Sequence, residues 1–271
     1  MIEDLFAIER LAYGDSPVHR LDARVKIVVS FSAIVALVAF PRGEGTFLLA
    51  LAFAVLLAAL VGVSRVRVRT FLFRMLVILP FGLSILLFQI IFPAVPAVSP
   101  TIVATLPFGI VITAEALVLA AQVGTRFVLS IGFIILLSST TTVQDLLTGA
   151  RRLGLPAEFT LILGMMTRYL FVFGQMYLRI RNALATRCFD PLDRALPYGY
   201  RLLQIGYTLG TMFIRSYEQG ERTYTAMLCR GYGRDAFLLV QKKPLLAHEW
   251  GVLGACMAIV IGAPVLLTLA A

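Results

Sequence analysis

Long apolar runs separated by arginine-rich segments constrain this chain more than any other feature. The runs cover residues 27–41, 46–63, 75–93, 112–137 and 249–270. A helix needs about 20 apolar residues to cross the hydrocarbon core of a bilayer. Apolar residues make up 59% of the chain, whereas soluble domains contain about 45–50%. The sequence therefore predicts an all-α, polytopic membrane protein with about five transmembrane helices.

Basic residues predict how these helices are oriented. If the loops alternate between the two sides of the membrane, 22 of the 24 lysines and arginines fall on one side, within residues 1–26, 64–74 and 138–248. Arg42 falls on the other side, and Arg126 lies within the fourth run. Cytoplasmic loops carry an excess of Lys and Arg. We therefore expect a cytoplasmic N-terminus and a C-terminus on the outer side.

The first apolar run is short for a membrane span. Residues 27–41 fall below the roughly 20 residues that a crossing helix needs. Val25 and Lys26 extend the run if the lysine reaches back to the interface, whereas a re-entrant hairpin over residues 27–63 is the alternative. Residues 1–10 are charged and lack the pattern of a cleavable signal peptide, so none is expected.

Arg126 is the one basic residue inside an apolar run, and we expect it in the cytoplasmic half of the fourth span. A charge at that depth is costly and normally faces protein or water. Glu115 lies about three helical turns away, too far for a direct ion pair. Two interpretations stay open: a contact with a partner or mobile joint, or hydrogen bonds to backbone carbonyls inside the bundle.

Residues 138–248 separate the last two apolar runs and predict helices that do not cross the membrane. Three threonines, 140–142, offer an N-cap for a short helix over residues 143–153. Two longer patterns, residues 157–187 and 198–231, each carry one polar stripe opposite an apolar face, which is typical of amphipathic helices.

The predicted organisation therefore has three parts. Residues 1–137 form an N-terminal segment and four transmembrane helices. Residues 138–248 form a cytoplasmic region of long amphipathic helices, and residues 249–271 form a C-terminal transmembrane helix.

The two long amphipathic patterns end in matching sequences. The first ends Ala-Leu-Ala-Thr-Arg-Cys-Phe at residues 183–189, and the second ends Ala-Met-Leu-Cys-Arg-Gly-Tyr at residues 226–232. One arginine near a helix C-terminus commonly complements the helix dipole, for a few tenths of a kcal/mol. Two matching ends instead favour a partner that presents the same groove twice, as a dimer does.

Several classes of chemistry lack their motifs. The chain has no GxxxxGK[ST] loop, no HExxH and no GxSxG. Its three cysteines, Cys188, Cys229 and Cys256, lack the spacing of a zinc site. Acidic residues are scarce in the apolar runs, which argues against a proton-coupled transporter. We expect no catalytic residues, metal site or cofactor; a membrane enzyme or stand-alone channel is the disfavoured alternative.

Three motifs carry a family resemblance. Residues 215–232 resemble the pattern RS-x-E-x-x-ER-x-Y-x-AM-x-x-RG-[FY], residues 21–26 resemble L-D-P-R-x-K with alanine for proline, and residues 153–156 resemble L-G-[VL]-P. Over nearly its whole length the chain resembles the transmembrane (T) component of energy-coupling factor (ECF) transporters, most closely the cobalt-type CbiQ family. That family has two arginine motifs, usually Ala-Arg-Gly. The first matching site here, Thr186-Arg187-Cys188, lacks both the alanine and the glycine.

The resemblance implies a coupling role without catalysis. Two ATPase subunits (CbiO-like) would each hold one arginine, and nucleotide-driven closure would be passed to a substrate-binding membrane subunit (CbiM-like, with a small CbiN-like auxiliary subunit). Cobalt uptake for cobalamin biosynthesis across the bacterial inner membrane is the implied role, and a vitamin-type or shared ECF module is the alternative; no nucleic-acid partner is implied. The implied ATPase-interface residues are Arg187, Arg230, Thr186, Cys188, Cys229 and Gly231. The implied secondary contacts are Arg151, Arg152, Arg215, Glu218 and Arg222.

Overall fold

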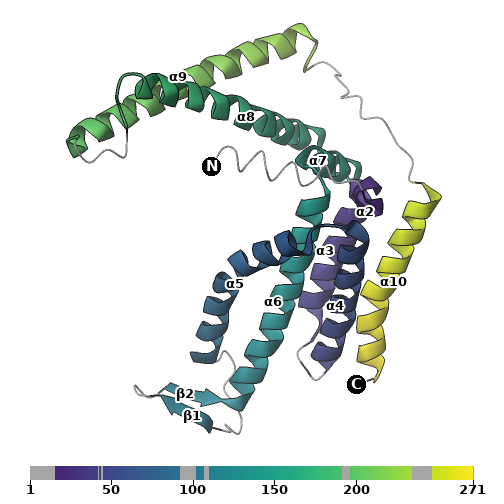
Figure 1. The fold of residues 1–271 in the computed structure, drawn as a ribbon. Helices are drawn as coiled ribbons and strands as arrows, with labels where there is room; N and C mark the ends of the chain where they lie inside the picture. Colours follow the sequence, from purple (N-terminus) through teal and green to yellow (C-terminus); the bar gives the residue numbers. More distant parts are fainter. Residues whose placement is uncertain are drawn as a thin grey trace. The chain divides into compact units, whose positions relative to one another are not determined.

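The structure is a computed structural model that describes residues 16–41, 43, 45–91, 102–106, 110–190, 196–233 and 246–270. These residues form two compact units, divided between residues 154 and 155 and again between 233 and 246. We call the first unit the bundle and the second the helix pair, and each is described by itself (Figure 1). Arg42, the lone basic residue expected on the outer side, and Pro191, which follows the first arginine sequence, lie outside the described residues.

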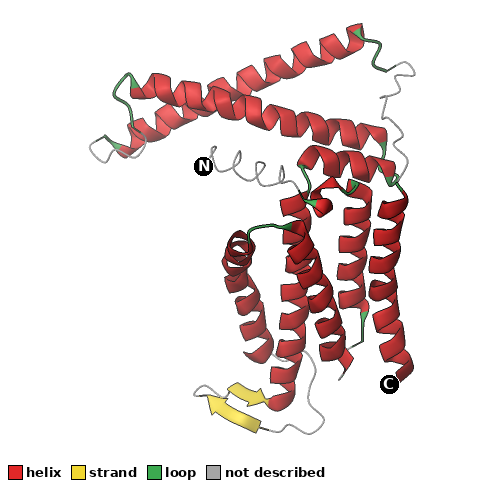
Figure 2. Cartoon of the chain, turned by 45° about the vertical axis from the view of Figure 1, so that its right-hand side comes forward, coloured by secondary structure: helices red, strands yellow, loops and turns green. Residues whose placement is uncertain are grey.

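The bundle contains seven described helices and one short hairpin (Figure 2). Strands β1 (Ile102–Leu106) and β2 (Ile110–Thr113) pair antiparallel between α5 (Val68–Ile91) and α6 (Ala114–Thr140), with Leu106 opposite Ile110; neither strand was predicted from the sequence. The helix pair consists of α8 (Ala157–Ala185) and α9 (Tyr198–Cys229). The bundle elements are α2 (Pro17–Arg20), α3 (Ala23–Ala39), α4 (Gly45–Ser64), α5 (Val68–Ile91), β1 (Ile102–Leu106), β2 (Ile110–Thr113), α6 (Ala114–Thr140), α7 (Val143–Arg152) and α10 (Ala247–Ala270).

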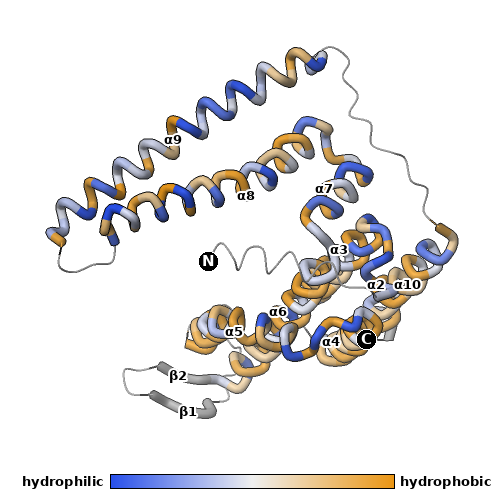
Figure 3. Tube along the Cα trace, turned by 45° about the horizontal axis from the view of Figure 1, so that its top comes forward, coloured by the Kyte–Doolittle hydropathy of each residue, from blue (hydrophilic) through white to orange (hydrophobic). Residues whose placement is uncertain are grey.

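The helical, polytopic class predicted from the sequence is confirmed. Within the described residues, five helices are long and apolar enough to cross a membrane: α4, α5, α6, α8 and α10. This set differs from the five apolar runs in one exchange. Helix α3 has only 17 residues, fewer than the roughly 20 that a crossing helix needs. Helix α8, treated above as amphipathic, is long and apolar enough to cross, although it is the least apolar of the five. The long bundle helices α3, α4, α5, α6 and α10 are largely apolar, whereas α7 is mostly hydrophilic and α9 alternates (Figure 3). Apolar residues all around a helix are expected where the surroundings are lipid.

The bundle core lies where α3, α4, α6 and α10 meet. Phe53 of α4 and Phe133 of α6 are fully buried and pack edge to face, with ring centroids 6.4 Å apart. Leu37 of α3 and Val260 of α10 complete this layer with 0% and 1% of their surfaces exposed. Gly132 admits the close approach of α4, because a Cβ there would lie 2.6 Å from a methyl group of Leu57.

Polar contacts near both ends of α3 show how far this helix extends along α6. At one end, Lys26 Nζ donates to the carbonyl of Thr140 at 2.9 Å. At the other, Gln122 Nε2 donates to the carbonyl of Gly43, in the α3–α4 turn, at 3.2 Å. The stretch of α6 from Gln122 to Thr140 is about 27 Å long, close to the roughly 30 Å of a hydrocarbon core. This length favours a spanning α3–α4 pair over the shallow re-entrant hairpin.

Arg126 binds the same turn. Its guanidinium donates to the carbonyls of Val38 (3.5 Å) and Pro41 (3.3 Å) and to the hydroxyl of Thr46 (3.3 Å). The last carbonyls of a helix lack internal partners, and a cation stabilises that end. Of the two interpretations left open, the structure therefore places Arg126 on backbone carbonyls. The side chain reaches toward the end of the bundle opposite Thr140.

Candidate functional site

Helix α8 ends in a Schellman motif that places Arg187 at the helix terminus. The amide of Phe189 donates to the carbonyl of Leu184 at 3.1 Å, and the amide of Cys188 donates to that of Ala185 at 3.0 Å. Cys188 has a left-handed φ of 58°. These two bonds and the left-handed residue define the motif, in which Arg187 is the last residue before the chain turns away.

Helix α9 ends with the same backbone arrangement. The amide of Tyr232 donates to the carbonyl of Met227 at 3.0 Å, and the amide of Gly231 donates to that of Leu228 at 2.9 Å. Gly231 takes the left-handed position, with φ of 82°. Arg230 therefore occupies the place that Arg187 occupies on α8, so the sequence match between the two ends corresponds to a match in backbone geometry.

The left-handed position explains why the two ends differ in sequence. A residue with a Cβ pays about 1–2 kcal/mol for left-handed backbone, whereas glycine adopts it freely. Gly231 is the residue expected there, and Cys188 is the less favourable choice. The first end therefore keeps the same backbone geometry although it departs from the Arg-Gly pattern. The left-handed backbone costs more free energy at Cys188 than at Gly231.

Both arginine ends are open to solvent. Arg187 and Arg230 are exposed, as are their neighbours Thr186, Cys229 and Gly231. Within the described residues neither guanidinium takes part in an ion pair. Two exposed, unpaired guanidinium groups on rigid helix ends are suited to bind carboxylates or carbonyls of another chain.

Antiparallel packing sends the two ends in opposite directions. The hydroxyl groups of Tyr169 on α8 and Thr223 on α9 are hydrogen-bonded at 2.5 Å. The buried ring of Phe189, just past the end of α8, packs edge to face on the ring of Tyr200 near the start of α9, with ring centroids 6.1 Å apart. Counting helical rise from the Tyr169–Thr223 contact, the arginine ends lie roughly 35 Å apart along the pair. One compact pocket cannot enclose both ends.

The remaining predicted contact residues divide between the two units. Arg215, Glu218 and Arg222 are exposed on α9, where Arg222 and Glu218 form an ion pair at 3.6 Å; a pair so exposed contributes little to stability. Arg151 and Arg152 belong to α7 in the bundle. The hydroxyl of Thr142 accepts a hydrogen bond from the amide of Asp145 and caps α7, as the threonine run predicted.

Helix α7 is fastened to the start of α3. Arg152 donates to Asp22 at 3.1 Å, and both side chains are largely buried. Asp22 Oδ1 also accepts from the amide of Arg24 and so caps α3. Gly149 faces α3 so closely that a Cβ there would lie 2.9 Å from the Cβ of Ala23 and 3.2 Å from the amide nitrogen of Arg24.

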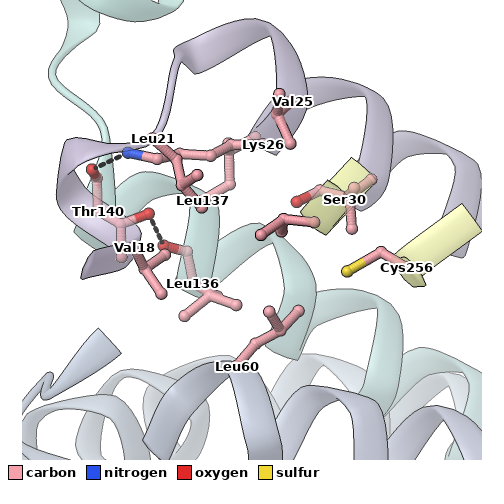
Figure 4. A pocket seen from close by; sticks show the side chains of 12 residues that line it. Val18, Leu21, Val25, Lys26, Ser30, Leu60, Leu136, Leu137, Thr140 and Cys256 are labelled. Carbon is pink, nitrogen blue, oxygen red and sulfur yellow. Dashed lines mark hydrogen bonds between the residues drawn. The ribbon is translucent and has the colours of Figure 1, made fainter. Parts of the chain in front are cut away.

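A second carboxylate joins α10 to the same junction. Glu249, only 5% exposed, accepts from the amide of Asp22 at 2.9 Å and from that of Leu246 at 2.8 Å. Lys26 links α3 to the end of α6 and borders a cavity of about 30 Å³, with room for one water molecule (Figure 4). The sequence pattern of residues 21–26 suggested a family resemblance and an extension of the first span, but it did not reveal the roles of Asp22, Gly149 and Glu249.

The comparisons with known proteins identify the family. The sequence model of the family CbiQ, described as cobalt transport protein, matches residues 14–237. The chain belongs to the CbiQ family. It is 25% identical over 219 residues to an uncharacterized protein of Methanocaldococcus jannaschii, covering 80% of this chain and 72% of that protein. It is also 34% identical over 93 residues to the nickel permease LarQ of Lactiplantibacillus plantarum, covering 34% of this chain and 32% of that one.

Family and structure agree on a membrane transport role. The chain is a multi-pass membrane protein of a family described as cobalt transport protein. Groups of His, Cys, Asp or Glu arranged to hold a metal ion are absent from the described residues.

Replacing Cys188 with glycine tests the Schellman geometry. Glycine removes the cost of the left-handed backbone, so Cys188→Gly should raise the free energy of unfolding by up to about 1 kcal/mol. The matched control is Cys229→Gly, which puts glycine in the right-handed part of the other end and should lower stability by up to about 1 kcal/mol. Thermal unfolding of the purified chain in detergent measures both, and equal shifts would contradict the assignment.

Replacing Gly149 tests the contact between α7 and α3. Gly149→Ala should lower the free energy of unfolding by about 1–3 kcal/mol, because the new methyl group meets backbone atoms that cannot move aside. Gly164→Ala on α8 is the control, since nothing lies within 4 Å of its Cβ position; there, alanine should be neutral or stabilising by up to about 1 kcal/mol. A stabilising Gly149→Ala would show that α7 is not held against α3.

Proposed function

We propose that this chain is the coupling subunit of an ATP-driven, ECF-type cobalt uptake transporter. In this role it transmits the closure of two CbiO-like ATPase subunits to a CbiM-like substrate-binding membrane subunit, accompanied by a small CbiN-like subunit. The chain itself neither hydrolyses ATP nor binds the metal. Membership of a cobalt transport family and the resemblance of residues 215–232 to the coupling helices of T components support the proposal.

The observation that carries the proposal is the pair of equivalent arginine ends. Arg187 and Arg230 occupy the same position of the same terminal motif, and both are exposed. Their separation of roughly 35 Å suits two separate grooves better than one. A dimeric ATPase offers the same groove twice, so each ATPase copy binds one arginine.

The topology follows from the same proposal. The helix pair lies on the cytoplasmic side, the N-terminus is cytoplasmic and the C-terminus is outside, in the inner membrane of a bacterium. Although α8 is long and apolar enough to span, it carries exposed Arg168 and Arg179 along its length and has no buried residue. Such a helix suits a surface covered by partner subunits. With α3 as a span instead, the bundle retains five spans and the positive-inside distribution.

Co-purification of the complex tests the coupling role. The tagged chain is expressed with its ATPase and substrate-binding subunits, and the retained ATPase is quantified. Arg187→Glu and Arg230→Glu should each weaken retention, and the double variant should abolish it, because a central interface arginine commonly contributes 2 kcal/mol or more. Arg179→Glu, an exposed arginine away from the end of α8, is the control and should retain the ATPase. Full retention in the double variant would refute the two-groove arrangement.

Metal uptake distinguishes the proposed substrate from the alternatives. Cells that express the whole transporter should accumulate labelled cobalt only when the chain is present, and the double arginine variant should reduce accumulation to background. Nickel is the second ion to measure, because LarQ is a nickel permease. Uptake of a vitamin without either metal would instead support the vitamin-type or shared ECF module.

A further inference from the structure

The turn between α4 and α5 concentrates arginine at one edge of the bundle. Four arginines fall within ten residues, at positions 65, 67, 69 and 74. Helices α4 and α5 are both candidate membrane spans. The short turn that joins them must therefore lie at the boundary between hydrocarbon and water, whichever side of the membrane that is.

Three of these arginines differ from the fourth. Arg74 donates to the hydroxyl of Ser139 at 3.0 Å and so holds α5 against the end of α6. Arg65, Arg67 and Arg69 are exposed, and within the described residues none of them forms an ion pair. We call these three residues the arginine turn. Three neighbouring like charges repel one another, and Arg69 also sits at the positive end of the α5 dipole.

The apolar neighbours of the arginine turn indicate where an anion would come from. Val68, Leu72 and Phe73, in the first turns of α5, are 59%, 56% and 65% exposed. Large exposed apolar groups beside arginines are typical of a segment at the membrane interface, with rings and methyl groups in the acyl chains and guanidinium groups among the headgroups.

We propose that the arginine turn binds the phosphodiester headgroup of an anionic phospholipid. Among the described residues the positive charge has no carboxylate partner, and the guanidinium fork bonds two phosphate oxygens at once. The adjacent Val68, Leu72 and Phe73 contact the acyl chains of the same lipid. A soluble phosphate compound matches the charge but leaves those three side chains uncovered. This site is independent of the ATPase-coupling role proposed above.

Lipid titration of the purified full-length chain tests the site. The chain is held in a neutral detergent, and its melting temperature is followed as short-chain phosphatidylglycerol, short-chain phosphatidylcholine or inorganic phosphate is added. Phosphatidylglycerol should raise the melting temperature at the lowest concentration, phosphatidylcholine only at much higher concentration, and inorganic phosphate not at all. High salt should weaken the first effect, because exposed charges are screened.

Arginine variants assign the effect to this turn. Each surface arginine contributes roughly fivefold to binding of anionic lipid, so changing Arg65, Arg67 and Arg69 together to Gln should weaken phosphatidylglycerol binding at least about tenfold. The same three positions changed to Lys keep the charge and should bind with intermediate affinity. This variant also shows whether loss of binding reflects loss of folding. The matched control, Arg168, Arg179 and Arg181 changed to Gln on α8, removes the same charge and should bind normally.

Three outcomes would overturn the proposal. Equal responses to phosphatidylglycerol and phosphatidylcholine would show that the headgroup charge is not recognised. Equal losses in the Gln variant and the α8 control would show a general charge effect without a site. Unchanged lipid binding together with loss of a co-purified protein subunit would assign the arginine turn to a protein partner.

Discussion

The bundle depends on satisfying polar groups where water is absent. Helix α6 does this at two levels for its neighbour α3. At its C-terminal end, the carbonyl of Thr140 accepts from Lys26. Toward its other end, Gln122, about 27 Å from Thr140 along the helix, and Arg126 donate to the α3–α4 turn. Unsatisfied backbone groups in a bilayer cost several kcal/mol each. These contacts explain how a helix of only 17 residues keeps a fixed register against one of 27.

Polar groups at the start of α3 are likewise satisfied by residues from α7 and α10. The carboxylate of Asp22 binds Arg152 of α7, and its backbone amide is held by Glu249 of α10. Charged groups that are largely buried need partners, and here groups from α7 and α10 meet at the start of α3. Because Gly149 leaves no space between α7 and α3, α7 belongs to the bundle. The division between the two units falls just beyond it, near Gly154, whose left-handed φ of 115° lets the chain turn.

The sequence indicated some of this molecule and not the rest, for identifiable reasons. Periodic patterns predicted α7, α8 and α9 nearly to the residue, and the threonine run predicted the cap of α7, because these signals are local. Contacts between distant residues leave no such signal: Asp22 and Arg152 are 130 positions apart, and nothing in either segment indicates that the two side chains pair with each other. The β1–β2 hairpin was missed for another reason: its strands have only five and four residues, and β2 overlaps the start of the fourth apolar run. Composition alone also cannot separate α8 from a span, because α8 is long and apolar enough to cross a membrane.

The two arginine ends show how the same helix terminus can be built twice from different residues. The Schellman bonds fix the direction in which the last residue leaves each helix, so the arginine position follows from backbone geometry rather than from neighbouring side chains. Thr186 and Cys188 can therefore replace the small residues of the usual motif without moving Arg187. What such a motif must conserve is the left-handed turn after the arginine, and cysteine meets that requirement at an energetic cost. A partner that binds both ends thus needs to recognise only a guanidinium on a rigid helix terminus.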